Sequence, residues 1–218
     1  RNIKHLHLFT SIFIDEFSVA RLKASNKEKN PVSYKLGFRL SNFPLANFSL
    51  TGEWTRNEIL VYKHSIPALT WATNGFNLGN YLGDNSKEMY VALQYKPLRG
   101  LDINLSYTKA EHGNEYAYIR HGTWQGSKAS VLDIISEPFM KDKIWSNKTL
   151  SFDVKYEISP NIYAILNIEN SNIQAFEAAS EVAFGEKRMT AEEVLNFYTP
   201  KFLQGKQTTI TAGLSFGF

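Results

Sequence analysis

The side chains that could carry out catalysis or hold a metal are few and scattered along the chain. Of the five histidines, only His5 and His7 have the i, i+2 spacing that places two side chains on one face of a strand, and no third ligand lies near them in the sequence. Glu53 and Glu58 have the residue type of a glycosidase pair, but their separation in space cannot be read from the sequence. Cysteine is absent, and the chain has no G-x-S-x-G, H-E-x-x-H, P-loop or dinucleotide-binding motif. We therefore expect no enzymatic activity, no metal and no other cofactor.

The segment from Asn57 to Lys87 combines aromatic side chains with amides and a histidine, a mixture suited to binding sugars. Sugar rings stack their C–H faces on aromatic rings, and polar side chains reach the hydroxyl groups. The stacking candidates are Tyr62, Trp71 and Tyr81, and the hydrogen-bonding candidates are His64, Asn74 and Asn77. The alternative is that these aromatic rings pack the loop onto itself. The sequence leaves both possibilities open.

Apolar and polar residues alternate in a series of segments, which predicts β-strands that have one apolar and one polar face. The aromatic share of 14% is high and favours strands as well. The alternation is clear in Val32–Leu40, Phe48–Thr55, Met89–Tyr95, Leu101–Thr108, Leu150–Glu157 and Ile210–Phe218, and weaker in Ile3–Ile14 and Ile162–Glu169. About eight strands result, each near the roughly 9–11 residues of a tilted membrane strand.

The connections between these segments alternate strictly between short and long. The short ones are Ser41–Asn47, Pro97–Gly100 and Ser159–Asn161, and the long ones are Asp15–Pro31, Asn57–Lys87, Ala110–Lys148 and Asn170–Lys206. Outer-membrane barrels have short periplasmic turns and long extracellular loops. A β-sandwich, the alternative for alternating strands, has little reason to keep this order. Several apolar rows also end in an aromatic residue, as membrane barrels require at the headgroup level: Trp54, Tyr95, Tyr107 and Tyr156.

We therefore predict an all-β chain in which residues 1–218 form a transmembrane, antiparallel, up-and-down β-barrel. Short helices are expected in the long loops. Thr190 and Glu193 have the spacing of a capping box, which predicts a helix with Val194, Phe197 and Tyr198 on its apolar face. A second short helix is predicted at Gln174–Phe184. No run approaches the roughly 18 apolar residues of a membrane helix.

The end of the chain resembles the terminal signal of outer-membrane barrels, which ends in two aromatic residues separated by one position. Here the pattern is carried by Thr211, Gly213, Phe216 and Phe218. The resemblance implies recognition by the barrel assembly machinery during insertion. The last strand is an edge that must be captured before a barrel closes.

A series of short motifs occupies the middle of the chain: Glu53-Trp54-Thr55-Arg56, Val61-Tyr62-Lys63-His64, Asn74-Gly75-Phe76-Asn77-Leu78-Gly79 and Leu82-Gly83-Asp84-Asn85-Ser86. This series resembles the capsule assembly Wzi family, especially the Wzi-like proteins of Bacteroidetes, in which a tyrosine usually stands in place of Trp54. The resemblance covers Glu53–Gly113, with weaker similarity at Ile14–Phe17 and Leu203–Lys206. It implies the C-terminal portion of a larger, non-enzymatic barrel in the bacterial outer membrane, with extracellular loops that bind or organise surface polysaccharide.

The expected partners are outer-membrane lipid and lipopolysaccharide, surface polysaccharide, and other outer-membrane proteins. The net charge of +3 is far from the strongly basic balance of a nucleic-acid-binding protein, so we expect no nucleic acid. Two alternatives to polysaccharide binding remain at this stage. One is a barrel subunit or scaffold of a larger outer-membrane complex, and the other is a porin.

Overall fold

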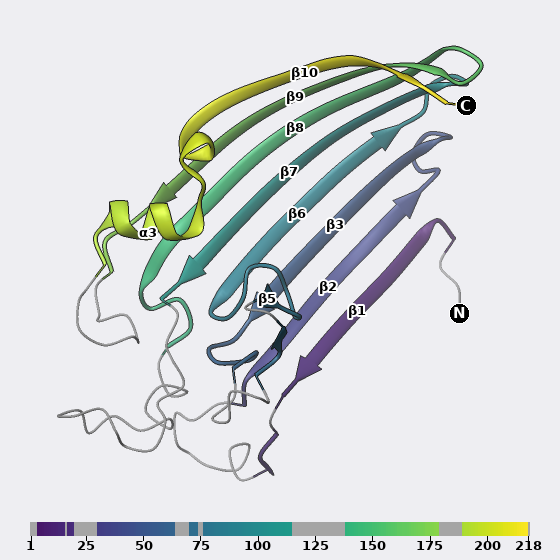
Figure 1. Cartoon of the computed structure of the whole chain (residues 1–218). Coiled ribbons are helices and arrows are strands. Elements are labelled where there is room, and N and C mark those ends of the chain that lie inside the picture. The colour runs from purple at the N-terminus through teal and green to yellow at the C-terminus, as the bar shows by residue number, and fades with distance from the viewer. Residues whose placement is uncertain are drawn as a thin grey trace, which may run out of the picture.

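The computed structural model of the chain describes residues 4–15, 17–19, 30–63, 70–73, 76–114, 138–178 and 189–217. Eight strands form one antiparallel sheet (Figure 1), and each strand pairs with the strand that follows it in the sheet order β1-β2-β3-β6-β7-β8-β9-β10. Their bounds are β1 (Leu6–Ile14), β2 (Val32–Ser41), β3 (Phe48–Asn57), β6 (Ser86–Tyr95), β7 (Leu101–Gly113), β8 (Lys143–Ser159), β9 (Ile162–Ala175) and β10 (Gly205–Phe216). The all-β, up-and-down prediction is therefore confirmed.

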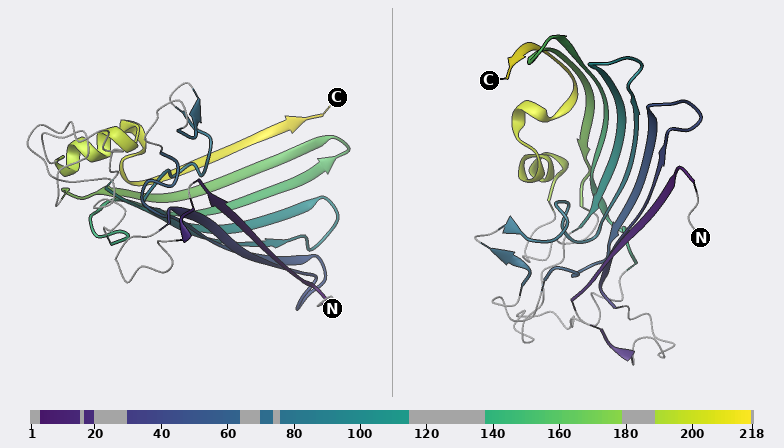
Figure 2. Two further views of the ribbon diagram at one scale, coloured as in Figure 1. Left: turned by 90° about the horizontal axis from the view of Figure 1, so that it is seen from below. Right: turned by 90° about the vertical axis from the view of Figure 1, so that its right-hand side faces the viewer.

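The sheet is curved and open over the described residues, with β1 and β10 as its two edges (Figures 1 and 2). A closed barrel is thus not part of the described structure. All the short turns lie at one end of the sheet, which we call the turn side, and the long connections lie at the other, the loop side. A small two-stranded sheet, β4 (Ala72–Thr73) with β5 (Phe76–Asn77), belongs to the loop side.

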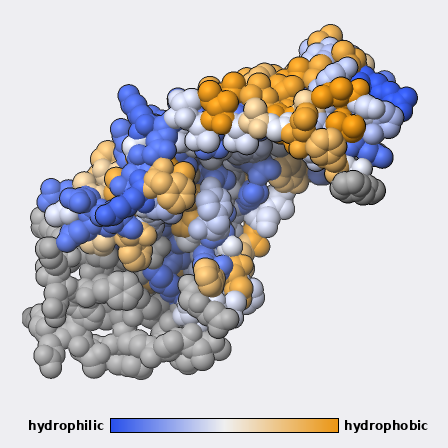
Figure 3. Space-filling model, turned by 45° about the horizontal axis from the view of Figure 1, so that its top comes forward, coloured by the Kyte–Doolittle hydropathy of each residue, from blue (hydrophilic) through white to orange (hydrophobic). Residues whose placement is uncertain are grey.

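The alternating pattern gives the sheet one apolar and one polar face. One cross-strand row is apolar on every strand, and its members are Leu6, Leu40, Leu50, Leu93, Leu105, Phe152, Ile168 and Ile210. The opposite face carries polar pairs between neighbouring strands, such as Lys35 with Glu53 and Asn104 with Asp153. In a space-filling view, hydrophobic residues form a continuous area over the strands (Figure 3).

The apolar face is exposed, because the described residues place no second layer on it. Leu36, Phe38, Leu105 and Leu214 are 36–61% exposed. Leu93 and Val154 lie on the same face and are partly covered. A β-sandwich would have buried these side chains in a packed centre, and the described structure has none there. The predicted division into one apolar and one polar face is confirmed, and the described residues do not form the packed centre that the sandwich alternative requires.

The apolar residues form a band that is inclined to the cross-strand rows. On the loop side the last apolar residue of the band is Ile14 on β1, Trp54 on β3, Tyr107 on β7 and Ile210 on β10. The cross-strand row that contains Ile210 on β10 contains Leu6 on β1. Leu6 and Ile14 are eight residues apart along that strand. At about 3.3 Å per residue and about 4.8 Å per strand, the border of the band is inclined by roughly 40° over the width of the sheet.

The helix α3 (Ala191–Tyr198) and the short 3-10 helix η2 (Lys201–Leu203) lie on the concave side of the sheet (Figure 2). The predicted capping box is confirmed: Thr190 accepts from the backbone of Glu193, whose side chain accepts from the backbone of Thr190. Val194 is fully buried in a small core against the strand ends. The remaining members of this core are Leu82, Ala110, Ile144, Trp145, Ile173 and Ala178. The described residues contain no helix with the length and apolar character of a membrane span.

Two sequence-based expectations for the loops are corrected. Phe197 was expected on the apolar face of its helix but is 70% exposed, because the core under α3 is filled by Val194. Gln174 and Ala175 extend β9 instead of starting a helix, since they pair with the beginning of β8. The residues after Ala178 in that predicted helix lie outside the described part of the chain.

Candidate functional site

A cavity of about 400 Å³ opens at the loop side, between the polar face of the first three strands and the connection from β3 to β6. We call it the loop-side pocket. It is lined by Ser11, Phe13, Ser33, Lys35, Thr55, Tyr62, Trp71, Leu78, Gly79 and Asn80. Its size falls within the range of small-molecule sites, about 300–1,000 Å³.

One wall of the loop-side pocket is aromatic. The ring of Phe13 has its centroid 5.3 Å from the ring of Tyr62 and 5.4 Å from the ring of Trp71. Trp71 is 44% exposed, whereas Tyr62 is only 5% exposed. Trp71 therefore offers a ring surface to a ligand, with the other two rings behind it.

Tyr62 links the loop to the sheet by hydrogen bonds. Its hydroxyl lies 2.8 Å from Ser33 Oγ and 3.1 Å from Asn57 Oδ1, and its backbone N–H donates to Asp84 Oδ1 at 2.9 Å. Its ring also lies against Gly79, where an added Cβ would approach the ring to 2.2 Å. A larger residue at Gly79 would push the ring out of place. In this geometry Tyr62 packs the loop, which was the alternative to a stacking role.

The motif from Leu82 to Ser86 forms the buried base of the same loop. Asn85 donates from Nδ2 to the carbonyl of Asn114 at 2.9 Å and accepts from the backbone of Met140 at 3.0 Å. Ser86 Oγ accepts from Asn57 Nδ2 at 2.7 Å. These buried side chains connect the ends of β3, β6 and β7, so the motif holds the loop side together.

The other sugar-binding candidates are dispersed. Asn77 is exposed but its side chain closes a local turn, donating to Asn80 O and accepting from Gly79 N, both at 2.9 Å. Tyr81 is 70% exposed, and its hydroxyl donates to the carboxylate of Glu88 on the polar face. His64 and Asn74 lie outside the described residues.

The floor of the loop-side pocket contains residues that the sequence analysis did not single out. Thr55 is 2% exposed, and its Oγ1 has no hydrogen-bond partner among the described residues. Lys35 Nζ lies 2.8 Å from Glu53 Oε2. Phe13 was also missed, although Phe9 and Phe13 alternate with Leu8 and Ile12 and therefore place aromatic rings on the otherwise polar face.

Of the predicted terminal signal, Thr211 and Gly213 lie on the polar face of β10, and Phe216 lies on the apolar face and is 56% exposed. Phe218 is outside the described residues. Within the described ranges no group of three or more His, Cys, Asp or Glu residues is arranged to hold a metal ion.

Comparison of the chain with family models, with curated proteins and with solved structures gave no match.

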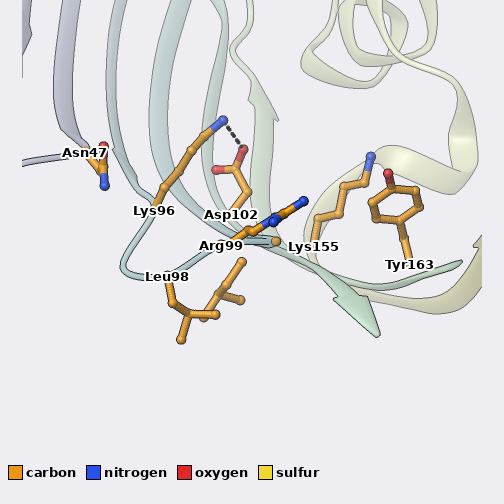
Figure 4. Close-up of a pocket in the computed structure, with 9 residues that line it drawn as sticks. Asn47, Lys96, Leu98, Arg99, Asp102, Lys155 and Tyr163 are labelled. Atoms are coloured by element: carbon orange, nitrogen blue, oxygen red, sulfur yellow. Dashed lines mark ion pairs between the residues drawn. The ribbon is translucent and has the colours of Figure 1, made fainter. Parts of the chain in front are cut away.

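A second cavity, of about 500 Å³, lies at the turn side of the polar face (Figure 4). Lys96, Arg99 and Lys155 surround it, and Asp102 pairs with Lys96 at 3.1 Å. The Lys155 ammonium lies 4.2 Å from the centre of the Tyr163 ring. This cavity is lined by three basic side chains and by Tyr163, and no tryptophan lines it. The two cavities therefore differ in the ligands that they suit.

Proposed function

We propose that the sheet is part of the wall of an outer-membrane β-barrel and that its loop-side pocket contributes to binding a surface polysaccharide. The observation that carries the first half is the apolar band. It crosses all eight strands on a face that no other described element covers. Soluble monomers rarely expose contiguous apolar patches beyond a few hundred Å². Lipid is the environment that suits such a face.

Two further features support a membrane wall. The band is inclined by roughly 40° to the strand-pairing direction, close to the about 35–45° tilt of strands in membrane barrels. The opposite face is polar, as the interior of such a barrel is. The free edges of β1 and β10 would each have to pair with a further strand, because lipid cannot satisfy open backbone groups.

The alternation of short turns and long loops gives the orientation. In outer-membrane barrels the long connections face outward, so the loop-side pocket would open to the cell exterior. The resemblance of Glu53–Gly113 to the capsule assembly Wzi family supports a polymer of sugars as the ligand. Trp71 would stack on a sugar face, and Lys35 would donate to its hydroxyl groups.

Each of these contacts is modest, because a sugar hydroxyl exchanges a hydrogen bond with water for one with the protein. Affinity for a polymer would then arise from many repeated contacts on many copies of the protein. Unlike an enzyme site, such a surface needs no titrating group in the pocket.

The test is retention of the surface polysaccharide purified from the producing cells on immobilised, detergent-solubilised protein. Trp71→Ala should lower retention severalfold. Phe197→Ala is the matched control, since it removes an aromatic ring that is 70% exposed on α3 and does not line the pocket. Equal retention by both variants and the unchanged protein would count against the polysaccharide role. Stable co-purification with another outer-membrane protein in that case would favour the scaffold alternative.

A further inference from the structure

Basic residues border the apolar band on its loop side. On four neighbouring strands, the next side chain on the apolar face beyond the last apolar residue is basic: Arg56 after Trp54, Lys87 after Met89, Lys109 after Tyr107 and Lys148 after Leu150. On each of these four strands the basic residue occupies the first position on that face beyond the end of the band, although the band is inclined to the cross-strand rows. The basic residues therefore follow the border of the band and not a single cross-strand row.

Several of these side chains face like charges. Arg56 lies directly opposite Lys87, and Lys109 lies directly opposite Lys148. Like charges in directly opposed positions destabilise a sheet. Lys206 on β10 lies in the same cross-strand row as Lys109 and Lys148, next to Asn172 of β9, and one position farther from the band, because Thr208 stands between it and Ile210. A negatively charged ligand that lies between such pairs would reduce the repulsion and stabilise the sheet.

The nearby carboxylates neutralise only part of this charge. Glu111 lies 2.9 Å from Lys87, 3.3 Å from Lys143 and 3.7 Å from Lys109. Glu111 lies beyond the band. Burial acts to raise its pKa, but the hydrogen bonds and charges of these lysines outweigh burial, so its pKa is lowered and the group stays ionised.

Glu58 likewise pairs with Arg56 at 2.6 Å. Among the described residues, no carboxylate lies within ion-pair distance of Lys148 or Lys206. Within the described ranges, five basic side chains of this border therefore stand against two carboxylates, Glu58 and Glu111; the five are Arg56, Lys87, Lys109, Lys148 and Lys206. The excess positive charge is greatest at Lys109, Lys148 and Lys206, which span β7 to β10.

We propose that this basic border binds the phosphate groups of an anionic membrane lipid whose acyl chains lie against the apolar band. The proposal rests on the membrane-wall function above and adds a lipid ligand for the loop-side border of that wall. Phosphates of a lipid lie at the end of its hydrocarbon, which is where the border lies relative to the band. Lysine and arginine bind phosphate by charge-assisted hydrogen bonds. On the loop side the lipid would belong to the outer leaflet, and a phosphorylated, acylated glucosamine disaccharide fits that chemistry.

The experiment measures lipid binding to the detergent-solubilised full chain by native mass spectrometry. The probes are lipid A, the neutral-headgroup lipid phosphatidylethanolamine, deacylated lipid A and inorganic phosphate. Lipid A should bind in preference to phosphatidylethanolamine, and neither deacylated lipid A nor inorganic phosphate should compete at matched concentration. If deacylated lipid A or inorganic phosphate abolishes the binding of lipid A, the lipid assignment is overturned. The site would then bind phosphate alone.

The variant is Lys109→Gln with Lys148→Gln, which should weaken lipid A binding by roughly 10- to 30-fold, since each lysine near a membrane surface contributes a few-fold. The matched control is Lys155→Gln with Lys201→Gln, two lysines away from the border. Lys109→Arg with Lys148→Arg should restore binding. Unchanged binding in the Gln variant would overturn the proposal. A protein that inserts into bilayers but does not discriminate among the lipids refutes only this inference, whereas a failure to insert refutes the membrane wall itself.

Discussion

The ring of Phe13, on the first strand, packs 5.4 Å from the ring of Trp71, in the connection between β3 and β6. Because Phe13 also contacts Tyr62, one side chain of β1 supports both loop residues that form the aromatic wall of the pocket. The exposed ring in the loop-side pocket is thus held by an edge strand of the sheet. Its position depends on residues that are distant in the sequence.

Replacing Phe13 with Ala should loosen Trp71 without unfolding the sheet. Aromatic pairs contribute about 0.5–1.5 kcal/mol each beyond their buried area, and two such contacts are lost. We expect faster acrylamide quenching of the Trp71 fluorescence, isolated as the difference between each protein and its Trp71→Phe derivative. Phe9→Ala, a change on the same face of β1 nearer the turn side, is the control. Identical quenching in both variants would show that Phe13 does not hold the ring.

Asn57 should be the most sensitive polar residue of the loop base. It is fully buried and its side chain meets Ser33, Tyr62 and Ser86. Asn57→Ala removes one hydrogen bond from each of these three groups, at about 0.5–1.5 kcal/mol per bond, although Tyr62 and Ser33 keep the bond to each other and Ser86 keeps its bond to the carbonyl of Gly83. A drop of about 2–4 kcal/mol in the free energy of unfolding, measured in urea from detergent micelles, is expected. The control is Asn170→Ala, which removes an exposed amide with one partner. It should change the free energy of unfolding by less than about 0.5 kcal/mol.

The strands follow from the sequence because their alternation is local, but their ends do not. Glu111–Gly113 and the start of β8 lack clear alternation, and they are strands because they pair with each other beneath α3. Likewise the sequence points to Trp71, but Thr55 and Phe13 join it only through the register of β1, β2 and β3. The packing of Tyr62 depends on Ser33, across the sheet, which no local pattern encodes.

The two faces of β7 should respond oppositely to a charge. Leu105→Arg places a cation in the middle of the apolar band and should cost about 2–4 kcal/mol of stability in bilayers. Ser106→Arg, one residue away on the polar face, should cost far less. Both are measured as urea unfolding from lipid vesicles, with the unchanged protein alongside. Comparable losses at the two positions would contradict a lipid-facing band.

The orientation of the sheet can be tested with single cysteines, since the chain has none of its own. Lys201→Cys lies on the loop side, and Arg99→Cys lies in the turn between β6 and β7, and both native side chains are exposed. In intact cells a membrane-impermeant maleimide should label the loop-side cysteine and leave the turn-side cysteine unlabelled. After the cells are broken open, both should react, which shows that the turn-side thiol is accessible in the folded protein. The expectation follows because short turns face the periplasm in outer-membrane barrels. Labelling of Arg99→Cys alone in intact cells would reverse the proposed orientation. The loop-side pocket would then lie away from any surface polysaccharide.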